Sequence, residues 1–487
     1  MLEARASSTG LAVNAHQIAL LRKTIDRLAG QYPMRTAQLG VAIMDGSDGR
    51  LLIDYQADHE FAPASNFKLL DAATALAYLG PGFRYHTRLL ARGTVSGNAL
   101  AGDLILVGGG DPVLSRGDLR NAVSALAARG IKRITGSVVV DGSIFDGQRF
   151  GSGWAWDDMP YYYQPPIEAL SLDEGTVEVT ASPGSQAGAP LRVWLQRDPG
   201  SMTVVSAGTT TAPRGLNDYD CFRSLGSTQI AVVGHMPLGE QPQTFHCTVE
   251  DSNLDSGAVF VQMLADAGIA VSTPALRAAP GNIALDVADS GPAPPPAALR
   301  YPGAQVVWDH ASPDVAELLR RMMPPSDNFI AEHLFKMLPV AALGRRGSFA
   351  GGAQVEQRFI ASLALPPLTI DNGDGSGLSQ GDRITPRAIA EVLRWETRNP
   401  AGVVFMHALA KAGINGTVRK HLRGTDAVGR VLAKDGYIWH VSTFSGYAYT
   451  KHHGLMIFSV MFNDANGMLG PFLRAEDKIV QTLVDLP

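Results

Sequence analysis

The chain has 487 residues, of which 45% are hydrophobic and 18% are charged. This composition can fold around hydrophobic cores, and the length suggests about three domains. The net charge is -5, and the 41 basic residues are scattered among 46 acidic ones without a basic stripe, so we expect no nucleic-acid partner. No window carries the ~18 uninterrupted apolar residues of a membrane span, and the first residues lack the apolar core of a signal peptide.

The N-terminal part predicts an α/β arrangement. A helix is expected over 16–30, and two short strands are expected over 38–45 and 50–55. A second helix begins at Ser65, shortly after a proline, and ends at Gly80-Pro81-Gly82. Strands and helices alternate here as in a mixed α/β domain.

The middle of the chain differs from both ends in composition and in predicted secondary structure. From about 87 to 302 it consists of short β-rich runs separated by Gly, Pro, Ser and Asp, with an extended connection over 280–302. Helical patterns then return, and strands and a last helix close the chain. We therefore expect a discontinuous domain, made of 1–86 and 303–487, with an inserted β-rich region over 87–302 that forms two smaller domains.

Two cysteines, Cys221 and Cys247, lie within this middle region and are the only ones in the chain. An even pair in one stretch permits a disulfide in an oxidising compartment, but it equally permits two buried thiols. The sequence leaves both interpretations open.

Ser65 and Lys68 are three residues apart at the start of the second helix. Side chains at this spacing are neighbours, so the lysine amine can reach the serine hydroxyl. A desolvated lysine has a lowered pKa and can activate a serine nucleophile, while the N-terminus of the helix favours a developing oxyanion. Two further motifs follow in the order of the S-x-x-K, S-D-N and K-T-G signature. The first is Ser326-Asp327-Asn328, which follows two prolines at a break between helices. The other is Lys434-Asp435-Gly436, an altered K-T-G motif in a predicted strand.

The sequence resembles the low-molecular-mass class C penicillin-binding proteins, the D-alanyl-D-alanine carboxypeptidase/endopeptidase family S13 typified by penicillin-binding protein 4. The resemblance extends over nearly the whole chain, through the stretches LVGGGDPVL, WAWDDMPYYYQPPIEALSLDEGTVEV, RRMMPPSDNFIAEHL, DNGDGSGLS and FSGYAYT. It implies a serine β-lactamase/transpeptidase-like α/β (α+β) fold with inserted domains. It also implies a serine D-Ala-D-Ala carboxypeptidase without cofactor or metal, acting on peptidoglycan stem peptides and open to acylation by β-lactams.

The same resemblance implies roles for single residues. Ser65 would attack the carbonyl of the penultimate D-alanine, and Lys68 would accept its proton. Ser326 would relay a proton to the leaving amine, Asn328 would bind the substrate amide, and Lys434 would contribute positive charge. Proteins of this family are periplasmic or associated with the cell wall, so we expect a periplasmic protein whose signal peptide has been removed, with peripheral membrane or wall association left open.

Asp435 departs from the family pattern. The residue between Lys434 and Gly436 is normally Thr or Ser there, and its hydroxyl donates a hydrogen bond to the substrate's terminal carboxylate. An ionised aspartate only accepts, and at ~4 Å from a carboxylate it would cost about 4 kcal/mol at an effective dielectric of roughly 20. Tyr437 is also bulky for this strand, where its backbone N–H and that of Ser65 would form the oxyanion hole.

Two expectations follow for Asp435. Either the chain acylates at Ser65 but handles D-Ala-D-Ala and penicillin less well than its relatives, or Asp435 turns aside or pairs with a nearby cation and the enzyme is ordinary.

Two rival functions are also considered. Residues 377–381 spell G-x-S-x-G, but the strand expected over 367–371 ends too early to place Ser379 on a nucleophile elbow. The non-enzymatic alternative is a degenerate scaffold that binds peptidoglycan or a wall protein without turnover, which the altered strand favours and the intact serine, lysine and S-D-N motif oppose. No HExxH motif or Cys/His cluster with zinc spacing is present, so no metal is expected.

Overall fold

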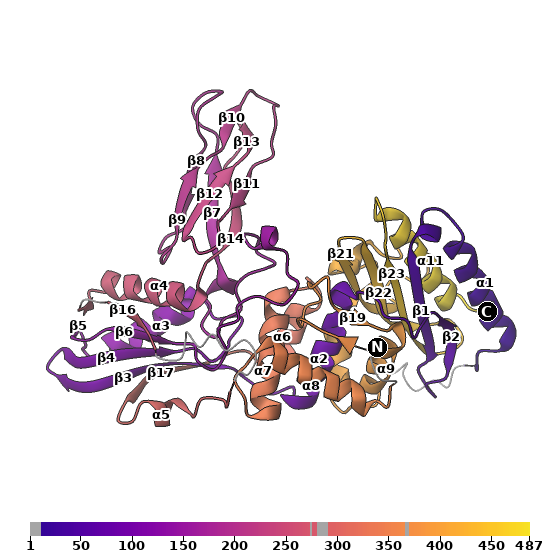
Figure 1. Cartoon of the computed structure of the whole chain (residues 1–487), viewed down its shortest axis with the longest axis horizontal. Helices are drawn as coiled ribbons and strands as arrows, with labels where there is room; N and C mark the ends of the chain where they lie inside the picture. The colour runs from indigo at the N-terminus through magenta and orange to yellow at the C-terminus, as the bar shows by residue number, and fades with distance from the viewer. Residues whose placement is uncertain (1–10, 273–274, 280–290, 366–369) are drawn as a thin grey trace.

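Strands from both ends of the chain form one six-stranded antiparallel sheet (Figure 1). The computed structural model describes residues 11–272, 275–279, 291–365 and 370–487. The strand order is β2-β1-β23-β22-β21-β20. The bounds are β1 Gln38–Asp45, β2 Leu51–Tyr55, β20 Ala410–Lys411, β21 Val431–Ile438, β22 Val441–Tyr449 and β23 Leu455–Asn463. Because β1 pairs with β23 along its whole length, the two ends of the chain belong to one discontinuous domain, as the sequence predicts.

Helices cover both faces of this sheet because alternate residues of β1 enter different cores. Val41 and Ile43 pack with α1 and α11, whereas Ala42 and Met44 pack with α2 and α9. Within the described ranges no helix combines the length and apolar character needed to cross a bilayer. The helices of this domain are α1 Ala15–Ala29, α2 Phe67–Tyr78, α6 Val315–Met322, α7 Asn328–Leu343, α8 Phe349–Ser362, α9 Pro386–Glu396, α10 Gly402–Ala408 and α11 Gly470–Val484.

The first helix and the first two strands agree with the sequence prediction, and a capping box between Asn14 and Gln17 begins α1. The second helix differs. Residues Ala64–Asn66 form a 3-10 turn, η3, and α2 begins only at Phe67. The predicted start at Ser65 is wrong by two residues, because the chain enters the turn through Ala64 with a positive φ of 46°, which is outside the helical region.

The middle region contains a seven-stranded sheet that two helices cover. Its helices are α3 Arg116–Ala127 and α4 Ser252–Asp266. The sequence predicts short strands here and not these helices, although a capping box of Ser115 with Asp118 marks the start of α3. The last strand of this sheet, β17, begins after residue 302 and pairs with β3. The sheet therefore contains residues from both sides of the predicted boundary at 302/303, and the domain limits stay a prediction. The strands are β3 His86–Ser96, β4 Ala99–Val107, β5 Arg133–Ile134, β6 Val138–Asp141, β15 Ala270–Val271, β16 Leu276–Ala278 and β17 Gln305–Ala311. Part of the expected connection, 280–290, lies outside the described residues, and the short helix α5 Ala297–Arg300 follows it.

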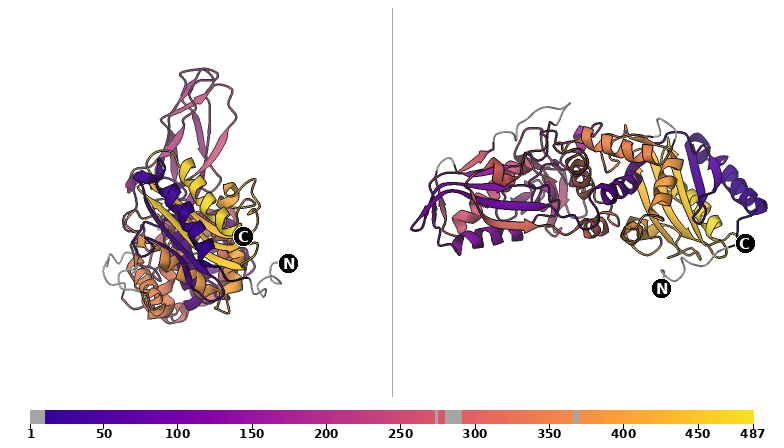
Figure 2. Two further views of the ribbon diagram at one scale, coloured as in Figure 1. Left: turned by 90° about the vertical axis from the view of Figure 1, so that its right-hand side faces the viewer. Right: turned by 90° about the horizontal axis from the view of Figure 1, so that it is seen from below.

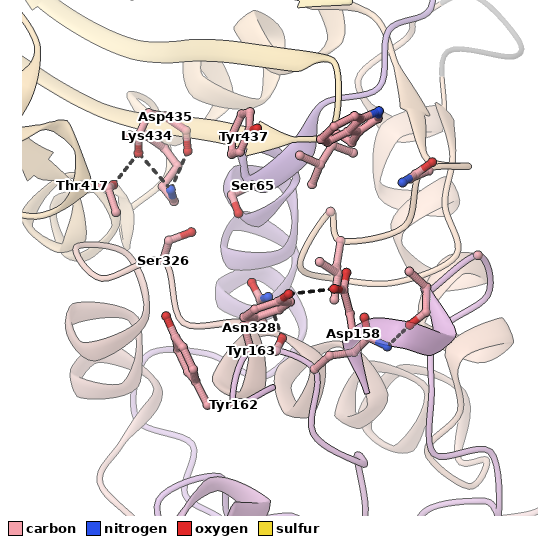
Figure 3. A pocket seen from close by; sticks show the side chains of 18 residues that line it. Ser65, Asp158, Tyr162, Tyr163, Ser326, Asn328, Thr417, Lys434, Asp435 and Tyr437 are labelled. Carbon is pink, nitrogen blue, oxygen red and sulfur yellow. Dashed lines mark hydrogen bonds and ion pairs between the residues drawn. The ribbon is translucent and has the colours of Figure 1, made fainter. Parts of the chain in front are cut away.

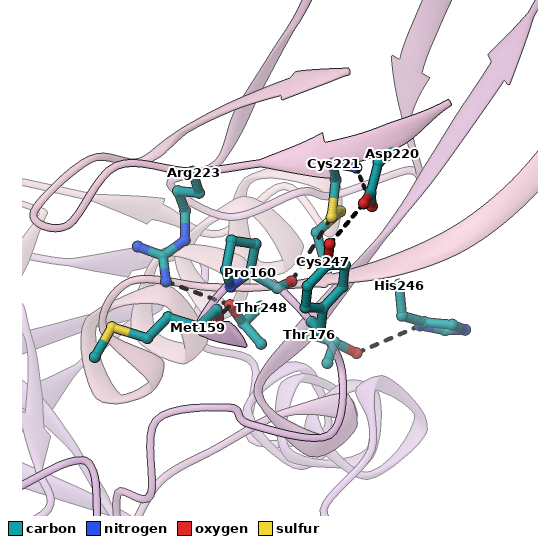
Figure 4. The surroundings of a disulfide bond; sticks show 10 residues. Met159, Pro160, Thr176, Asp220, Cys221, Arg223, His246, Cys247 and Thr248 are labelled. Atoms are coloured by element: carbon teal, nitrogen blue, oxygen red, sulfur yellow. Dashed lines mark hydrogen bonds between the residues drawn. A yellow bond between two sulfur atoms is a disulfide. The ribbon is translucent and has the colours of Figure 1, made fainter. Parts of the chain in front are cut away.

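Three small sheets form a module that projects from the rest of the molecule in both Figure 1 and Figure 2. A disulfide between Cys221 and Cys247 joins two of these sheets (Figure 4) and lies in the core of the module. The structure thereby decides between the two interpretations of the cysteine pair. The strands are β7 Thr176–Ser182, β8 Arg192–Leu195, β9 Thr203–Ser206, β10 Thr209–Thr211, β11 Asp220–Phe222, β12 Gln229–Val233, β13 His235–Pro237 and β14 Gln243–Thr248.

Candidate active site

Ser65 lies on the turn η3, which is fastened to strand β22. Asn66 Nδ2 donates to Thr443 Oγ1 over 2.6 Å, and that hydroxyl donates to the carbonyl oxygen of Pro63 over 2.8 Å. Both bonds are buried. The turn that carries the serine is therefore held at a fixed position against the sheet.

Gly436 allows strand β21 to lie directly against the same turn. A Cβ at this position would come within 2.9 Å of both the backbone nitrogen of Ser65 and the carbonyl oxygen of Pro63, and within 2.4 Å of Thr443 Oγ1. Any side chain would push the strand away. Glycine thus keeps the backbone of β21 next to the nucleophile.

Lys68 is fully buried on α2, one turn from the serine. Its Nζ lies 3.1 Å from Ser65 Oγ, 2.7 Å from Asn328 Oδ1 and 2.8 Å from the carbonyl oxygen of Ser376. A protonated amine can donate to all three acceptors. After losing one proton, the amine has a lone pair and can instead accept the serine hydroxyl hydrogen.

The pKa of Lys68 is lowered to about 7, first by burial and then by the positive charge of Lys434. The carboxyl groups of Glu332, Asp374 and Asp327 oppose the shift. Because the result is close to neutrality, a large fraction of Lys68 is unprotonated near pH 7. The lysine can therefore serve as a base at ordinary pH.

The carbonyl group of Ser376 is positioned by a buried carboxyl group. Glu332 of α7 accepts hydrogen bonds from the backbone N–H of Gly375 over 3.0 Å and of Ser376 over 2.9 Å. This fixes the loop whose carbonyl holds Lys68. The pKa of Glu332 is raised to about 8, first by burial and then by the nearby charge of Asp374.

The Ser326-Asp327-Asn328 motif forms the sharp junction between α6 and α7. Ser326 has a positive φ of 65°, which reverses the chain direction. The Asp327 side chain caps α7 by accepting from the N–H of Ile330 over 2.9 Å. Asn328 is the first helical residue, and its Nδ2 donates to the carbonyl of Tyr163 over 2.9 Å while its Oδ1 faces Lys68.

These motifs meet around one cavity of about 630 Å³ (Figure 3). Lys68 and Gly436 do not line the cavity, but both lie directly against Ser65. The fold therefore brings together all eight residues that the sequence predicts. Tyr437 and Trp439 are exposed at the rim. Within the described ranges no group of three His, Cys, Asp or Glu side chains could hold a metal ion. The predicted residues that line the cavity are Ser65, Ser326, Asn328, Lys434, Asp435 and Tyr437.

Asp435 pairs with the lysine that precedes it. Lys434 Nζ lies 3.3 Å from Asp435 Oδ1 and 2.5 Å from the carbonyl oxygen of the same residue. Thr417, on the 3-10 turn η6 (Thr417–Lys420), also donates its hydroxyl hydrogen to Oδ1. Burial raises the pKa of Asp435, but the charge of Lys434 and the Thr417 hydrogen bond outweigh it and hold the pKa below its usual value. Pairing with a nearby cation, one of the two expectations, is therefore observed.

Several residues of the site carry no prediction from the sequence. Ser376 and Tyr163 lie in stretches that resemble family blocks, but nothing in those stretches assigns them a contact. The hydroxyl of Tyr163 donates to Asp158 Oδ1 over 2.8 Å across the cavity wall, and burial together with this bond raises its pKa. Thr417 lies in no motif at all.

The G-x-S-x-G segment does not form a nucleophile elbow. Ser379 is buried, its Oγ accepts from the N–H of Gly381 over 3.1 Å, and its N–H donates to Asp374 Oδ2 over 2.7 Å. The short strand β19 (Arg383–Ile384) follows it in place of a helix. Most of the strand expected over 367–371 lies outside the described residues, which include only β18 (Ile370–Asp371) of it.

A helix-covered antiparallel sheet with a serine and a buried lysine on one turn, facing an S-D-N junction, defines a serine hydrolase of the β-lactamase/transpeptidase-like fold. The model of the D-Ala-D-Ala carboxypeptidase 3 (S13) family matches residues 21–482, and the chain belongs to this family. The predicted resemblance, fold class and serine D-Ala-D-Ala carboxypeptidase activity are thereby confirmed.

Individual relatives agree with this assignment. The chain is 30% identical over 477 residues to a D-alanyl-D-alanine carboxypeptidase of Actinomadura sp. (strain R39), covering 96% of this chain and 84% of the relative. It is 25% identical over 438 residues to D-alanyl-D-alanine carboxypeptidase DacB of Haemophilus influenzae, covering 88% and 85%. The crystal structure of penicillin binding protein 4 (dacB) from H. influenzae superposes with a TM-score of 0.83 at 22% identity, covering 95% of this chain and 99% of that one, which supports the shared fold.

Proposed function

We propose that this enzyme removes the terminal D-alanine from peptidoglycan stem peptides, and cleaves cross-linked stem peptides, through an acyl-enzyme on Ser65. The observation that carries the proposal is the buried Nζ of Lys68, which lies within hydrogen-bonding distance of Ser65 Oγ, Asn328 Oδ1 and the Ser376 carbonyl. An unprotonated amine within hydrogen-bonding distance of a serine hydroxyl is the arrangement that activates such a nucleophile.

In the acylation step, the unprotonated amine of Lys68 takes the hydroxyl hydrogen of Ser65 while Oγ bonds to the carbonyl carbon of the penultimate D-alanine. The carbonyl oxygen becomes an oxyanion, which the backbone N–H groups of Ser65 and Tyr437 stabilise. The close approach of β21 to the Ser65 backbone supports this placement. Fixed backbone donors of this kind supply a large share of the barrier reduction in acyl transfer.

Release of the leaving group needs a proton at its amine nitrogen. Ser326 passes this proton on from Lys68, while Asn328 binds the substrate amide and Lys434 contributes a positive charge, which Asp435 pairs. Water then attacks the acyl-enzyme with Lys68 again as base, and the shortened peptide leaves. All these groups lie around the same cavity.

We place the enzyme in the periplasm or at the cell wall, where its substrate is found. The disulfide of the projecting module supports an oxidising compartment. β-Lactams are expected to acylate Ser65. A β-lactam complex is known for H. influenzae penicillin binding protein 4, which shares the fold. Peripheral association with the membrane or the wall is part of the same proposal.

The test is mass spectrometry of muropeptides before and after incubation with the enzyme. Loss of one D-alanine and opening of cross-links give different mass changes. Ser65→Ala should abolish both, whereas the matched control Ser379→Ala should retain them. Product formation by Ser65→Ala, or its loss only in Ser379→Ala, would contradict the assignment. The absence of both mass changes, together with the absence of any covalent adduct on Ser65 from an activated ester, would instead favour the scaffold alternative.

A further inference from the structure

The side of the cavity next to Lys434 has an unusual distribution of hydrogen-bond donors and acceptors. Asp435 Oδ1 accepts hydrogen bonds from Thr417 and Lys434. Within the described residues, no group donates a hydrogen bond to the other oxygen, Oδ2, and 23% of the side chain is exposed where it lines the cavity. The lining of the cavity therefore includes a carboxylate with one oxygen that accepts from no described group.

Most of the donor hydrogens that could bind a substrate carboxylate here are already engaged by Asp435. The single hydroxyl hydrogen of Thr417 is donated to Asp435. Lys434 makes two contacts, both with Asp435, and it is the one cation among the described residues that line the cavity. Its charge is paired with an ionised carboxylate. A free carboxylate on the substrate would meet like charge rather than an open cation.

The ammonium group of Lys434 has three hydrogens and makes two contacts, both with Asp435, so one hydrogen is left to donate to a substrate in the same cavity. A hydrogen-bond donor next to an acceptor is the complement of a primary carboxamide, whose oxygen accepts and whose NH2 group donates. A carboxylate offers two acceptors and cannot satisfy Oδ2. Polar sites that match one hydrogen-bond pattern discriminate strongly against a ligand that leaves a buried group unpaired.

We propose that Asp435 makes this enzyme select substrates in which the residue released by acylation carries a primary carboxamide in place of a free carboxylate. This inference rests on the proposed function. In the step concerned, Ser65 Oγ bonds to the carbonyl carbon, the C–N bond breaks, and the nitrogen takes the proton, so that D-alaninamide leaves instead of D-alanine. The acyl-enzyme is the same for both substrates, so the selection acts on acylation alone.

The test compares diacetyl-L-Lys-D-Ala-D-Ala with diacetyl-L-Lys-D-Ala-D-alaninamide. Because deacylation is common to both, the ratio of their kcat/KM values, followed by mass spectrometry of the released D-alanine or D-alaninamide, reports on acylation. The native enzyme should favour the carboxamide by more than tenfold. Asp435→Thr restores the family residue and Asp435→Asn keeps the shape, and each should lower this ratio at least tenfold.

Asp426→Asn serves as the matched control. It removes an exposed aspartate of the same domain that pairs with Lys451 over 2.8 Å, and it should leave the ratio unchanged. A native ratio below ten, or a ratio that falls less than tenfold in both Asp435 variants, overturns the inference. If the native enzyme cleaves neither substrate and Ser65 accepts no acyl group from an activated ester, the proposed function fails as well, so the two failures can be told apart.

Discussion

Replacing Lys68 by arginine should separate the charge of this residue from its role as a base. Arginine keeps a positive charge next to Ser65, but its pKa lies above 12, so it does not lose its proton in a protein. Lys68, with a pKa lowered to about 7 by burial and by the charge of Lys434, is unprotonated in about half of the molecules at pH 7. Only the native enzyme can then accept the hydroxyl hydrogen of Ser65.

The size of the effect follows from the loss of general-base catalysis, which contributes roughly 10²-fold to 10⁴-fold to a rate. We expect Lys68→Arg to slow acylation by at least about 10²-fold at pH 8. The assay is stopped-flow acylation by a chromogenic β-lactam between pH 5.5 and pH 9. A base works only when unprotonated, so the native rate should fall as the pH drops below about 7 and level off above it. The acylation rate of Lys68→Arg should not change in this way with pH.

Lys336→Arg is the matched control for a buried lysine. Lys336 is also fully buried in the same domain, where it pairs with Asp146 over 2.8 Å, but it takes no part in the site. Thermal unfolding of both variants would show whether the larger side chain harms the fold. The reasoning is refuted if Lys68→Arg, folded as well as the control, acylates within threefold of the native rate, or if the native rate does not change between pH 6 and pH 8.

Three further predictions concern other parts of the chain. Gly436→Ala should reduce β-lactam acylation at least tenfold and also lower the melting temperature, because its Cβ would come 2.9 Å from the Ser65 nitrogen and 2.4 Å from Thr443 Oγ1; unchanged acylation would contradict the close approach. Replacing Cys221 and Cys247 by serine, which opens a link between residues 26 apart, should destabilise the projecting module by about 3 kcal/mol in denaturant titrations and leave acylation unchanged. Burial raises the pKa of Glu396 to about 8, so its folded form holds a proton that the unfolded chain releases near 4.5, and stability falls as the pH rises between these values. Glu396→Gln should therefore raise the melting temperature more at pH 9 than at pH 5, and an equal effect at both would contradict this.

Much of the fold and of the chemistry could be predicted from local patterns. Ser65 and Lys68 are near in sequence, so their contact depends on one turn of chain and survives the error of two residues in the start of α2. The discontinuous domain was predictable because the helical patterns that the sequence makes evident lie toward the two ends of the chain. Helices α3 and α4 were missed because short β-rich runs on both sides dominate the texture.

The sequence by itself predicted Ser65 as the nucleophile and Lys68 as its base, and it determined the order of the motifs, because these depend on residue type and on spacing within single elements. Only the tertiary structure decided what lies around them. Asn328 reaches Lys68 across 260 positions, and the Ser376 carbonyl reaches it from a loop that Glu332 holds. The orientation of Asp435 depends on a hydroxyl from another turn, and no periodicity within a strand encodes such a contact. The serine and the lysine could thus be predicted from the sequence. The substrate preference that we infer for Asp435 depends instead on how the turn η6 packs against strand β21.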